Sequence, residues 1–477
     1  MQVVLLIFSE IRYPNAILLS LEVGFIMANR ASWGSKLGFI LSVAGSAVGL
    51  ANIWRFPYIV GQYGGGAFIL MYLMALLLIG FPVFISEVVI GRKTQTNPSA
   101  AFAKLGGKGW GGAGKMTILT GFFVSAFYSA VAGWILGYLV EAAQGNLSSF
   151  ASTESVQQHH LSLMDNPYWG VTFHFLFLLS CVGVLMLGVR NGIERCNKIM
   201  MPLLFVVLIL LAIHGLMQRK ASEAMTFLLT PDWKAFSMEA ILVALGQAFF
   251  TLSLGQGTMV TYGSYLSRSE NLLRSCIPVV IMDTVVSLLS AVAVFTIVFS
   301  AGLEPNSGPG LIFHTLPWVF SQIPLGHGVA VLFFLLVVMA ALTSEISAME
   351  PTIAYLIDEK RWKRSSAVAL CGVGAFLLGI PAALSTSLLK NWTFHGMTWL
   401  DWMDYAATAI LIPLGGLVAV LLVGHRWGIE NALKEMGEGA GVNFKTKPWI
   451  SDYFWVCIKY TAPLLIIFIL INILGFI

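Results

Sequence analysis

The stretch GSAVGLANIWRFP, Gly45 to Pro57, decides how this chain folds. It places two glycines in the middle of an apolar segment, and Asn52 and Arg55 follow them directly. A glycine costs about 1 kcal/mol in the interior of a helix, and hydrocarbon penalises an arginine strongly. The stretch therefore predicts a membrane helix that is interrupted for a purpose.

The composition of the whole chain indicates a membrane protein. Of its 477 residues, 57% are hydrophobic and only 10% are charged, whereas soluble proteins carry about 25% charged residues. Apolar runs of about 20 residues recur along the chain, and each is long enough to cross a bilayer as a helix. We therefore predict an all-α polytopic membrane protein embedded in a lipid bilayer.

About eleven spans are predicted from the length of the apolar runs and from their flanks. Lys and Arg cluster at alternate connections, which places the N-terminus in the cytoplasm and, with an odd count, the C-terminus outside. The predicted spans are 36–60, 66–90, 115–142, 168–188, 197–217, 237–266, 272–300, 327–358, 365–384, 402–424 and 450–475.

Three regions follow from these spans. Residues 1–29 form a leader, which is either a start-site artefact or a disordered extension. Residues 30–424 form the core, whose halves are spans 1–5 (36–217) and 6–10 (237–424). Residues 425–477 contain a cytoplasmic loop and span 11.

Span 6 repeats the peculiarity of span 1, because SLGQG (Ser253 to Gly257) lies in its middle. Close packing of helices through small residues would explain either segment taken alone. Their separation by five spans favours an inverted repeat in which the first helix of each half is broken at the midplane. Such breaks expose carbonyl groups to cations and helix N-termini to anions.

Four motifs closely resemble the neurotransmitter:sodium symporter family, and the resemblance covers about residues 30–475. It implies a LeuT-type 5+5 inverted repeat with discontinuous helices 1 and 6. It also implies a bacterial-type transporter of the inner (plasma) membrane that imports a small molecule with sodium by alternating access, binds no nucleic acid and is not an enzyme. The motifs are WGSKLGFILSVAGSAVGLANIWRFPYIVGQYGGGAF (Trp33–Phe68), FFTLSLGQG (Phe249–Gly257), GPGLIFHTLP (Gly308–Pro317) and ALTSEIS (Ala341–Ser347).

The resemblance implies two sodium sites. In the family the carboxylate of the substrate completes the first site, so that ion and substrate each need the other. The second site bridges span 1 to span 8. The first site would comprise the Ala47 carbonyl, Asn52, Thr251 and Asp283; the second would comprise the carbonyls of Gly45, Val48 and Ala340 with the hydroxyls of Thr343 and Ser344.

Asp283 departs from the family pattern, because animal members usually carry an asparagine there. Chloride balances buried positive charge in chloride-dependent relatives, and a fixed carboxylate can do the same. We therefore hypothesise chloride-independent transport, with Asp283 taking a proton when sodium leaves. The alternative is that Asp283 only ligates sodium and that chloride still binds at the matching positions Tyr72, Gln247, Ser253 and Ser287.

The substrate pocket is expected at the two breaks. Gly49 stands where monoamine transporters carry an aspartate, which leaves room for a carboxylate and favours an amino acid. The carboxylate would meet the backbone N–H groups near Leu50 and Ala51 and the Tyr128 hydroxyl. The ammonium would meet the carbonyls of Ala47, Phe250 and Thr251 and the Ser253 side chain, while Val124, Phe250, Gln256, Ser344 and Ala348 would line the side-chain end.

Small departures at this pocket leave the amino acid open. Ala348 enlarges the pocket, Gln256 adds a hydrogen-bonding group, and Ser46 and Ala51 alter the surroundings of the break. These changes favour a neutral amino acid, which is either large and hydrophobic or polar.

Two charge pairs are expected to act as gates. Arg55 would meet Asp404 across the outer vestibule, above Tyr128 and Phe250. On the cytoplasmic side Arg30 would meet Asp358, aided by Trp33 and Tyr265. For Arg30 and Asp358 the residues alone, without the resemblance, favour charges that extend to the membrane interface. Glu87, in the middle of span 2, is expected to brace the unwound backbone.

Two alternatives remain beside sodium-driven import of an amino acid. A sensor on the same scaffold would keep the sites and lose transport, and a transporter of another small amine or zwitterion would change only the pocket. The oligomeric state stays open.

Overall fold

The computed structural model describes residues 31–302, 312–439 and 447–473. The predicted leader, with Arg30, lies outside these ranges. Nine helices in the described ranges are long and apolar enough to cross a membrane, and a bent pair makes a tenth. The remaining predicted span, 237–266, consists of two helices that are each too short to cross alone.

The predicted spans agree with the observed helices to within a few residues at most boundaries. Spans 2 to 5 are α5 (Gly66–Ala75) with η2 (Leu76–Gly80) and α6 (Phe81–Thr94), α8 (Trp110–Ala143), α10 (Pro167–Met186), and η3 (Val189–Glu194) with α11 (Arg195–Leu216). Spans 7 to 9 are α15 (Leu272–Ser300), α17 (Gly326–Lys360) and α18 (Arg364–Ala383). Span 10 comprises α19 (Trp399–Tyr405), η6 (Ala406–Leu411), α20 (Ile412–Leu421) and η7 (Leu422–Arg426), and span 11 comprises α22 (Pro448–Val456), η8 (Cys457–Thr461) and α23 (Ala462–Ile473).

Short helices lie in the connections between spans. They are α7 (Pro98–Gly106), α9 (Thr153–Met164), α12 (Ala221–Leu229), α16 (Thr315–Gln322) and α21 (Ile429–Gly437).

Span 1 is interrupted where its sequence predicted. Its first half, α3 (Lys36–Ala47), is capped at its N-terminus by Ser35, whose hydroxyl accepts the Gly38 N–H at 3.0 Å. The helix stops because Val48 adopts an extended conformation, with ψ at 107°. The second half, η1 (Ala51–Arg55) and α4 (Phe56–Gln62), lies at an angle of 52° to the first half.

Span 6 is interrupted between α13 (Met238–Thr251) and α14 (Thr258–Ser264). Gly255 and Gly257 in this break have φ angles of 73° and 74°, which only glycine adopts without strain. A Cβ on Gly255 would lie 2.0 Å from the carbonyl oxygen of Ile412 in α20. The Gly255 N–H donates to Glu87 Oε1 at 2.7 Å, so the expected brace reaches the break in span 6.

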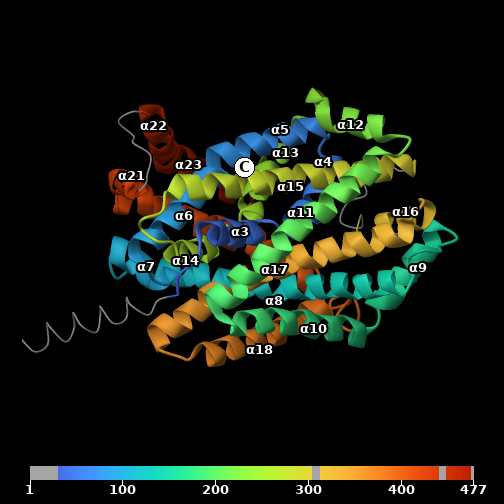
Figure 1. Ribbon diagram of the computed structural model, residues 1–477, viewed down its shortest axis with the longest axis horizontal. Helices are drawn as coiled ribbons and strands as arrows, with labels where there is room; N and C mark the ends of the chain where they lie inside the picture. The colour runs from blue at the N-terminus through green and yellow to red at the C-terminus, as the bar shows by residue number, and fades with distance from the viewer. Residues whose placement is uncertain (1–30, 303–311, 440–446, 474–477) are drawn as a thin grey trace, which may run out of the picture. The chain divides into compact units, whose positions relative to one another are not determined.

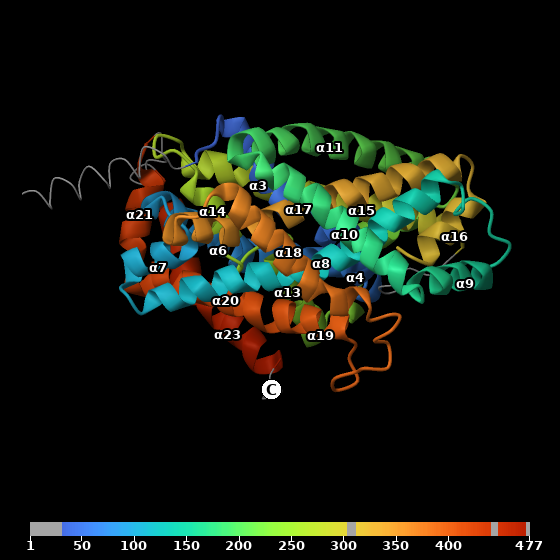
Figure 2. The ribbon, with the colours of Figure 1, turned by 90° about the horizontal axis from the view of Figure 1, so that it is seen from below.

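The broken helices lie inside the bundle. Figure 1 shows α3 in the middle of the view, and it packs against α11, α15 and α17. A second group of helices, α8, α10 and α18, runs side by side in both Figure 1 and Figure 2 and packs on α17. The unwound segments are therefore surrounded by protein, a setting in which non-helical backbone is tolerated at membrane depth.

Histidines gather in the connections outside the spans. The His160 ring on α9 accepts or donates a hydrogen bond at 2.7 Å to the Tyr138 hydroxyl. Its ring centroid lies 4.3 Å from that of His314, which precedes α16. The pKa of His160 is lowered to about 4, mainly by burial and to a smaller extent by the neighbouring His314 and His159. His160 is therefore neutral in the folded protein at pH values where an exposed histidine is charged.

This shift predicts a loss of stability in acid. A histidine in the unfolded chain titrates near 6.5, so the unfolded state binds more protons between about pH 6.5 and 4, and the free energy of unfolding falls as the pH drops through that window. We expect a loss of about 2 kcal/mol, allowing for partial exposure. The acid-induced fall in melting temperature should shrink in H160Q and persist in H395Q, whose histidine is exposed; an equal fall in H160Q would contradict the assignment.

Candidate ion and substrate site

Three of the residues predicted for the first sodium site lie in direct contact. Asn52 Nδ2 in η1 donates to Asp283 Oδ1 at 2.7 Å and to Thr251 Oγ1 at 2.9 Å. The Thr251 hydroxyl also donates to Asp283 Oδ1, at 2.9 Å. All three residues are fully buried. Segments from spans 1, 6 and 7 therefore bring a carboxylate, a hydroxyl and an amide to one point.

A second cluster of oxygens surrounds Ser344 of α17. Its hydroxyl lies 3.1 Å from the carbonyl oxygen of Val48, 3.2 Å from that of Ser46 and 3.4 Å from that of Gly45. On the preceding residue, Thr343 Oγ1 donates to the Ala340 carbonyl at 3.0 Å. The residues predicted for the second sodium site therefore meet where the break frees the carbonyls of α3 from helical hydrogen bonds.

The predicted carboxylate pocket joins these two clusters. The Leu50 N–H donates to the Tyr128 hydroxyl at 3.3 Å. A Cβ on Gly49 would lie 2.5 Å from Ser344 Oγ and 3.1 Å from the Tyr128 hydroxyl oxygen. The missing side chain of Gly49 is therefore what allows these groups to converge. The carbonyl of Ala51 accepts a hydrogen bond from Gln247 Nε2 at 3.0 Å.

The predicted side-chain end of the pocket is partly polar. A Cβ on Gly121 of α8 would lie 2.7 Å from the Gln256 carbonyl oxygen and 3.1 Å from the Ala348 carbonyl oxygen, which places those two residues against α8 one turn from Val124. Gln256 is buried, and its Oε1 has no partner among the described residues. Ser46 Oγ lies 2.7 Å from Ser347 Oγ.

The chloride-like positions are divided between two places. The Tyr72 hydroxyl donates to Asp283 Oδ2 at 3.3 Å, and Ser287 Oγ accepts from Asn52 Nδ2 at 2.8 Å. Ser253 instead donates to the Ser46 carbonyl at 2.8 Å and so ties the two breaks together. The buried carboxylate of Asp283 therefore occupies the point toward which Tyr72, Thr251 and Asn52 direct their donors.

No ion pair joins the predicted outer gate residues Arg55 and Asp404 in the part of the chain that the structure describes. The Arg55 guanidinium instead lies 4.9 Å from the centroid of the Phe250 ring. Arg55 therefore covers the Phe250 end of the predicted pocket.

The predicted pair of Arg30 with Asp358 stays a prediction, because Arg30 lies outside the described residues. Asp358 accepts the Asn97 N–H at 2.9 Å. The Trp33 ring packs edge-on against Tyr262 and Tyr265, and its Nε1 donates to the Tyr262 carbonyl at 3.0 Å. The start of span 1 is thus held against the second half of span 6.

Two buried carboxylates in span 8 were not singled out from the sequence. Glu350 accepts two hydrogen bonds from Arg364, at 3.0 and 2.7 Å, and one from the Tyr265 hydroxyl at 2.9 Å. Glu345 accepts a hydrogen bond from Ser125 of α8. The sequence could have pointed to both, because a charged residue within a membrane span is a candidate functional residue.

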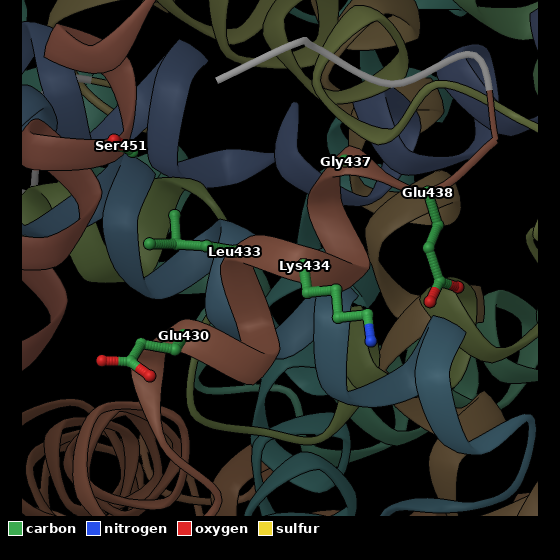
Figure 3. Close-up of a pocket in the computed structure, with 6 residues that line it drawn as sticks. All are labelled: Glu430, Leu433, Lys434, Gly437, Glu438 and Ser451. Atoms are coloured by element: carbon green, nitrogen blue, oxygen red, sulfur yellow. The ribbon is translucent and has the colours of Figure 1, made fainter. Parts of the chain in front are cut away.

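A pocket on the surface lies away from these clusters. Figure 3 shows its lining, which comes from α21 and the residue after it, with Ser451 from α22. None of the residues predicted for ions or substrate lines it. The central breaks, and not this pocket, are therefore the candidate functional site.

Two membrane helices broken at their middle, with clusters of oxygen atoms at the breaks, define a LeuT-type secondary transporter. The sequence profile of the Sodium:neurotransmitter symporter family matches residues 30–167 and 158–476. The chain belongs to this family of sodium-dependent transporters.

Individual relatives agree with this assignment. An uncharacterized sodium-dependent transporter of Bacillus subtilis, YhdH, is 38% identical over 93% of this chain and 97% of its own length. The sodium- and chloride-dependent taurine transporter of Rattus norvegicus is 26% identical over 90% of this chain and 76% of its own length. The crystal structure of MhsT in complex with L-phenylalanine matches this fold with a TM-score of 0.85 and a sequence identity of 39%. The match covers 93% of this chain and 100% of the MhsT chain.

Proposed function

We propose that this protein is a symporter that uses the sodium gradient to import a neutral amino acid by alternating access, without a requirement for chloride. The observation that carries the proposal is the contact of Asn52, Thr251 and Asp283 beside the Leu50 N–H and the Tyr128 hydroxyl. A sodium ion held by Asn52, Thr251 and Asp283 would lie next to a substrate carboxylate held by the Leu50 N–H and the Tyr128 hydroxyl. Each would then stabilise the other, and this reciprocal linkage is the coupling that symport needs.

The oxygen clusters suit sodium as the driving ion. Hard cations take oxygen ligands, and the two clusters consist of carbonyl, hydroxyl, amide and carboxylate oxygens. The Asn52 amide directs its NH2 group to Asp283 and its Oδ1 to the Gly49 N–H at 2.9 Å. Half a turn of this amide would present an oxygen to an ion beside Asp283. The cluster at Ser344 would hold a second ion between span 1 and span 8.

A neutral substrate is supported by the residues of the predicted pocket. Ser46, Val124, Gln256 and Ala348 carry no charge, so a charged side chain would be buried there without a partner, which is costly. The related MhsT was crystallised with L-phenylalanine, which is consistent with a neutral amino acid. Gln256, Ser46 and Ser347 offer hydrogen-bonding groups, so the pocket also suits a neutral amino acid with a polar side chain.

The position of Asp283 supports independence from chloride. Its carboxylate is fully buried and accepts hydrogen bonds from Asn52, Thr251 and Tyr72. It therefore supplies the fixed negative charge that would balance a bound cation. A second anion beside it would face like-charge repulsion in a medium of low dielectric constant.

Uptake measured with the purified protein in proteoliposomes tests the proposal. Proteoliposomes with an inward sodium gradient should accumulate a radiolabelled neutral amino acid, first identified by a thermal-shift screen of the twenty amino acids with and without sodium. Replacement of chloride by gluconate should leave uptake unchanged, and replacement of sodium by potassium should abolish it. Binding that depends on sodium without any accumulation would identify the sensor instead, and uptake that collapses in gluconate would refute independence from chloride.

A further inference from the structure

Span 5 carries a buried amide beside the second oxygen cluster. Asn197 of α11 is fully buried, and its Oδ1 has no hydrogen-bond partner among the described residues. A buried acceptor without a partner costs about 1–3 kcal/mol. Such an atom in the middle of a membrane protein needs an explanation, and a bound cation is one that would remove the cost.

The direction of this amide is determined by its other end. Asn197 Nδ2 donates to the carbonyl oxygen of Ile193 at 2.8 Å. A carbonyl group can only accept a hydrogen bond, so the NH2 group must face Ile193. The Oδ1 atom therefore points the opposite way.

That direction leads to the residues predicted for the second sodium site. A Cβ on Gly45 would lie 1.9 Å from Asn197 Oδ1 and 3.3 Å from Thr343 Cβ. The same small volume is thus bordered by the Asn197 oxygen, by Gly45 and by Thr343. Gly45 and Ser344 are already in contact through the Gly45 carbonyl, at 3.4 Å.

We propose that Asn197 is a further ligand of the ion held between spans 1 and 8, lending its side-chain oxygen from span 5. This inference rests on the second sodium site of the proposed function and adds a third helix to it. The five oxygens predicted for the site leave room for one more, since hard cations such as Ca²⁺ and Mg²⁺ are surrounded by six or more oxygens. The ligand is neutral, so it adds coordination without adding charge.

The added ligand connects ion binding to the inner end of the bundle. Glu194, one turn before Asn197, accepts the Gly34 N–H at 2.6 Å and the Ser35 hydroxyl at 3.2 Å. Span 5 therefore holds the start of α3 through Glu194 and reaches its end through Asn197. An ion at Asn197 would stiffen the contact between these two spans, and its departure would loosen it.

Sodium binding to the purified full-length chain, measured without any amino acid, tests this proposal. The variant N197L keeps the approximate volume of the side chain and removes the oxygen, whereas N197A removes both. We expect each to raise the half-saturating sodium concentration by roughly tenfold or more, because even the loss of a group that only orients a metal's ligands lowers affinity by about 10–100-fold. The control S275A removes a buried hydroxyl near the start of span 7 that also has no partner among the described residues, and it should stay within about twofold of the wild type.

Double variants locate the effect. N197L combined with T343A should be less than additive, because both would remove ligands of one ion, whereas N197L combined with N52A should be additive. Wild-type sodium affinity in N197L with a loss in N197A would show that Asn197 only fills space and would overturn the proposal, as would additivity with T343A. If N197L does not fold in potassium buffer, N197A with the same double variants decides the question. Because no amino acid is added, a failure of amino-acid uptake leaves this result unaffected.

Discussion

Replacing Asp283 by asparagine is expected to make sodium-driven uptake dependent on chloride. The amide has nearly the shape of the carboxylate and keeps one oxygen for the ion, but it removes the fixed negative charge. A bound cation would then lie in a buried site without a counter-charge, which costs about 3–5 kcal/mol. We therefore expect uptake in gluconate buffer to fall by at least about 100-fold.

Chloride should restore part of that loss. The Tyr72 hydroxyl donates to Asp283, and the Ser287 hydroxyl lies beside Asn52, so both are placed to turn toward an anion once the carboxylate is gone. Uptake by D283N is measured in proteoliposomes over a range of chloride concentrations at constant sodium. D165N is the matched control, because Asp165 is exposed and pairs with Lys390 at 3.0 Å away from the site. D283N that transports in gluconate as well as the wild type would refute the role of Asp283 in charge balance.

Replacing Gly255 by alanine is expected to prevent the protein from folding stably. The new Cβ would lie 2.0 Å from the Ile412 carbonyl oxygen and 3.1 Å from the Gly416 nitrogen, and both are backbone atoms that cannot rotate away. The φ angle of 73° at this position adds strain for any residue with a Cβ, about 1–2 kcal/mol. We expect a loss of several kcal/mol in total, seen as aggregation on size-exclusion chromatography or a fall in melting temperature.

Gly246 provides the control in the same broken span. It lies in α13, and a Cβ there would meet nothing within 4 Å. Alanine in a helix interior is favoured over glycine by about 1 kcal/mol, so G246A should match or slightly exceed the wild-type melting temperature. A stable, monodisperse G255A would show that α20 does not press on the break, and would contradict the packing described above.

The spans could be predicted because they respond to one dominant force. A backbone in hydrocarbon must satisfy its own hydrogen bonds, so each apolar run of sufficient length becomes a helix. The interruption of spans 1 and 6 was also readable, since Gly45, Gly49, Gly255 and Gly257 stand where glycine is otherwise costly. The number of spans that are continuous was harder to judge, because span 6 consists of two helices that are each too short to cross the membrane.

The partners of the charged residues were not readable in the same way. Arg55 lies over Phe250, and Glu350 pairs with Arg364 and Tyr265. These contacts join different spans, and their geometry depends on how the helices cross. The sequence shows which residues are charged, but it does not show how far apart they lie in the folded protein.

By itself, the sequence determined that this protein is a bundle of membrane helices with two broken spans, because hydropathy and glycine act locally along the chain. The family resemblance indicated which residues meet at those breaks, and only the tertiary structure decided their contacts. It placed Asp283 of span 7 against Asn52 and Thr251. It also turned the side-chain oxygen of Asn197 in span 5, which has no hydrogen-bond partner among the described residues, toward Gly45. Such contacts depend on packing between helices far apart in the chain, and no local preference of the residues specifies them.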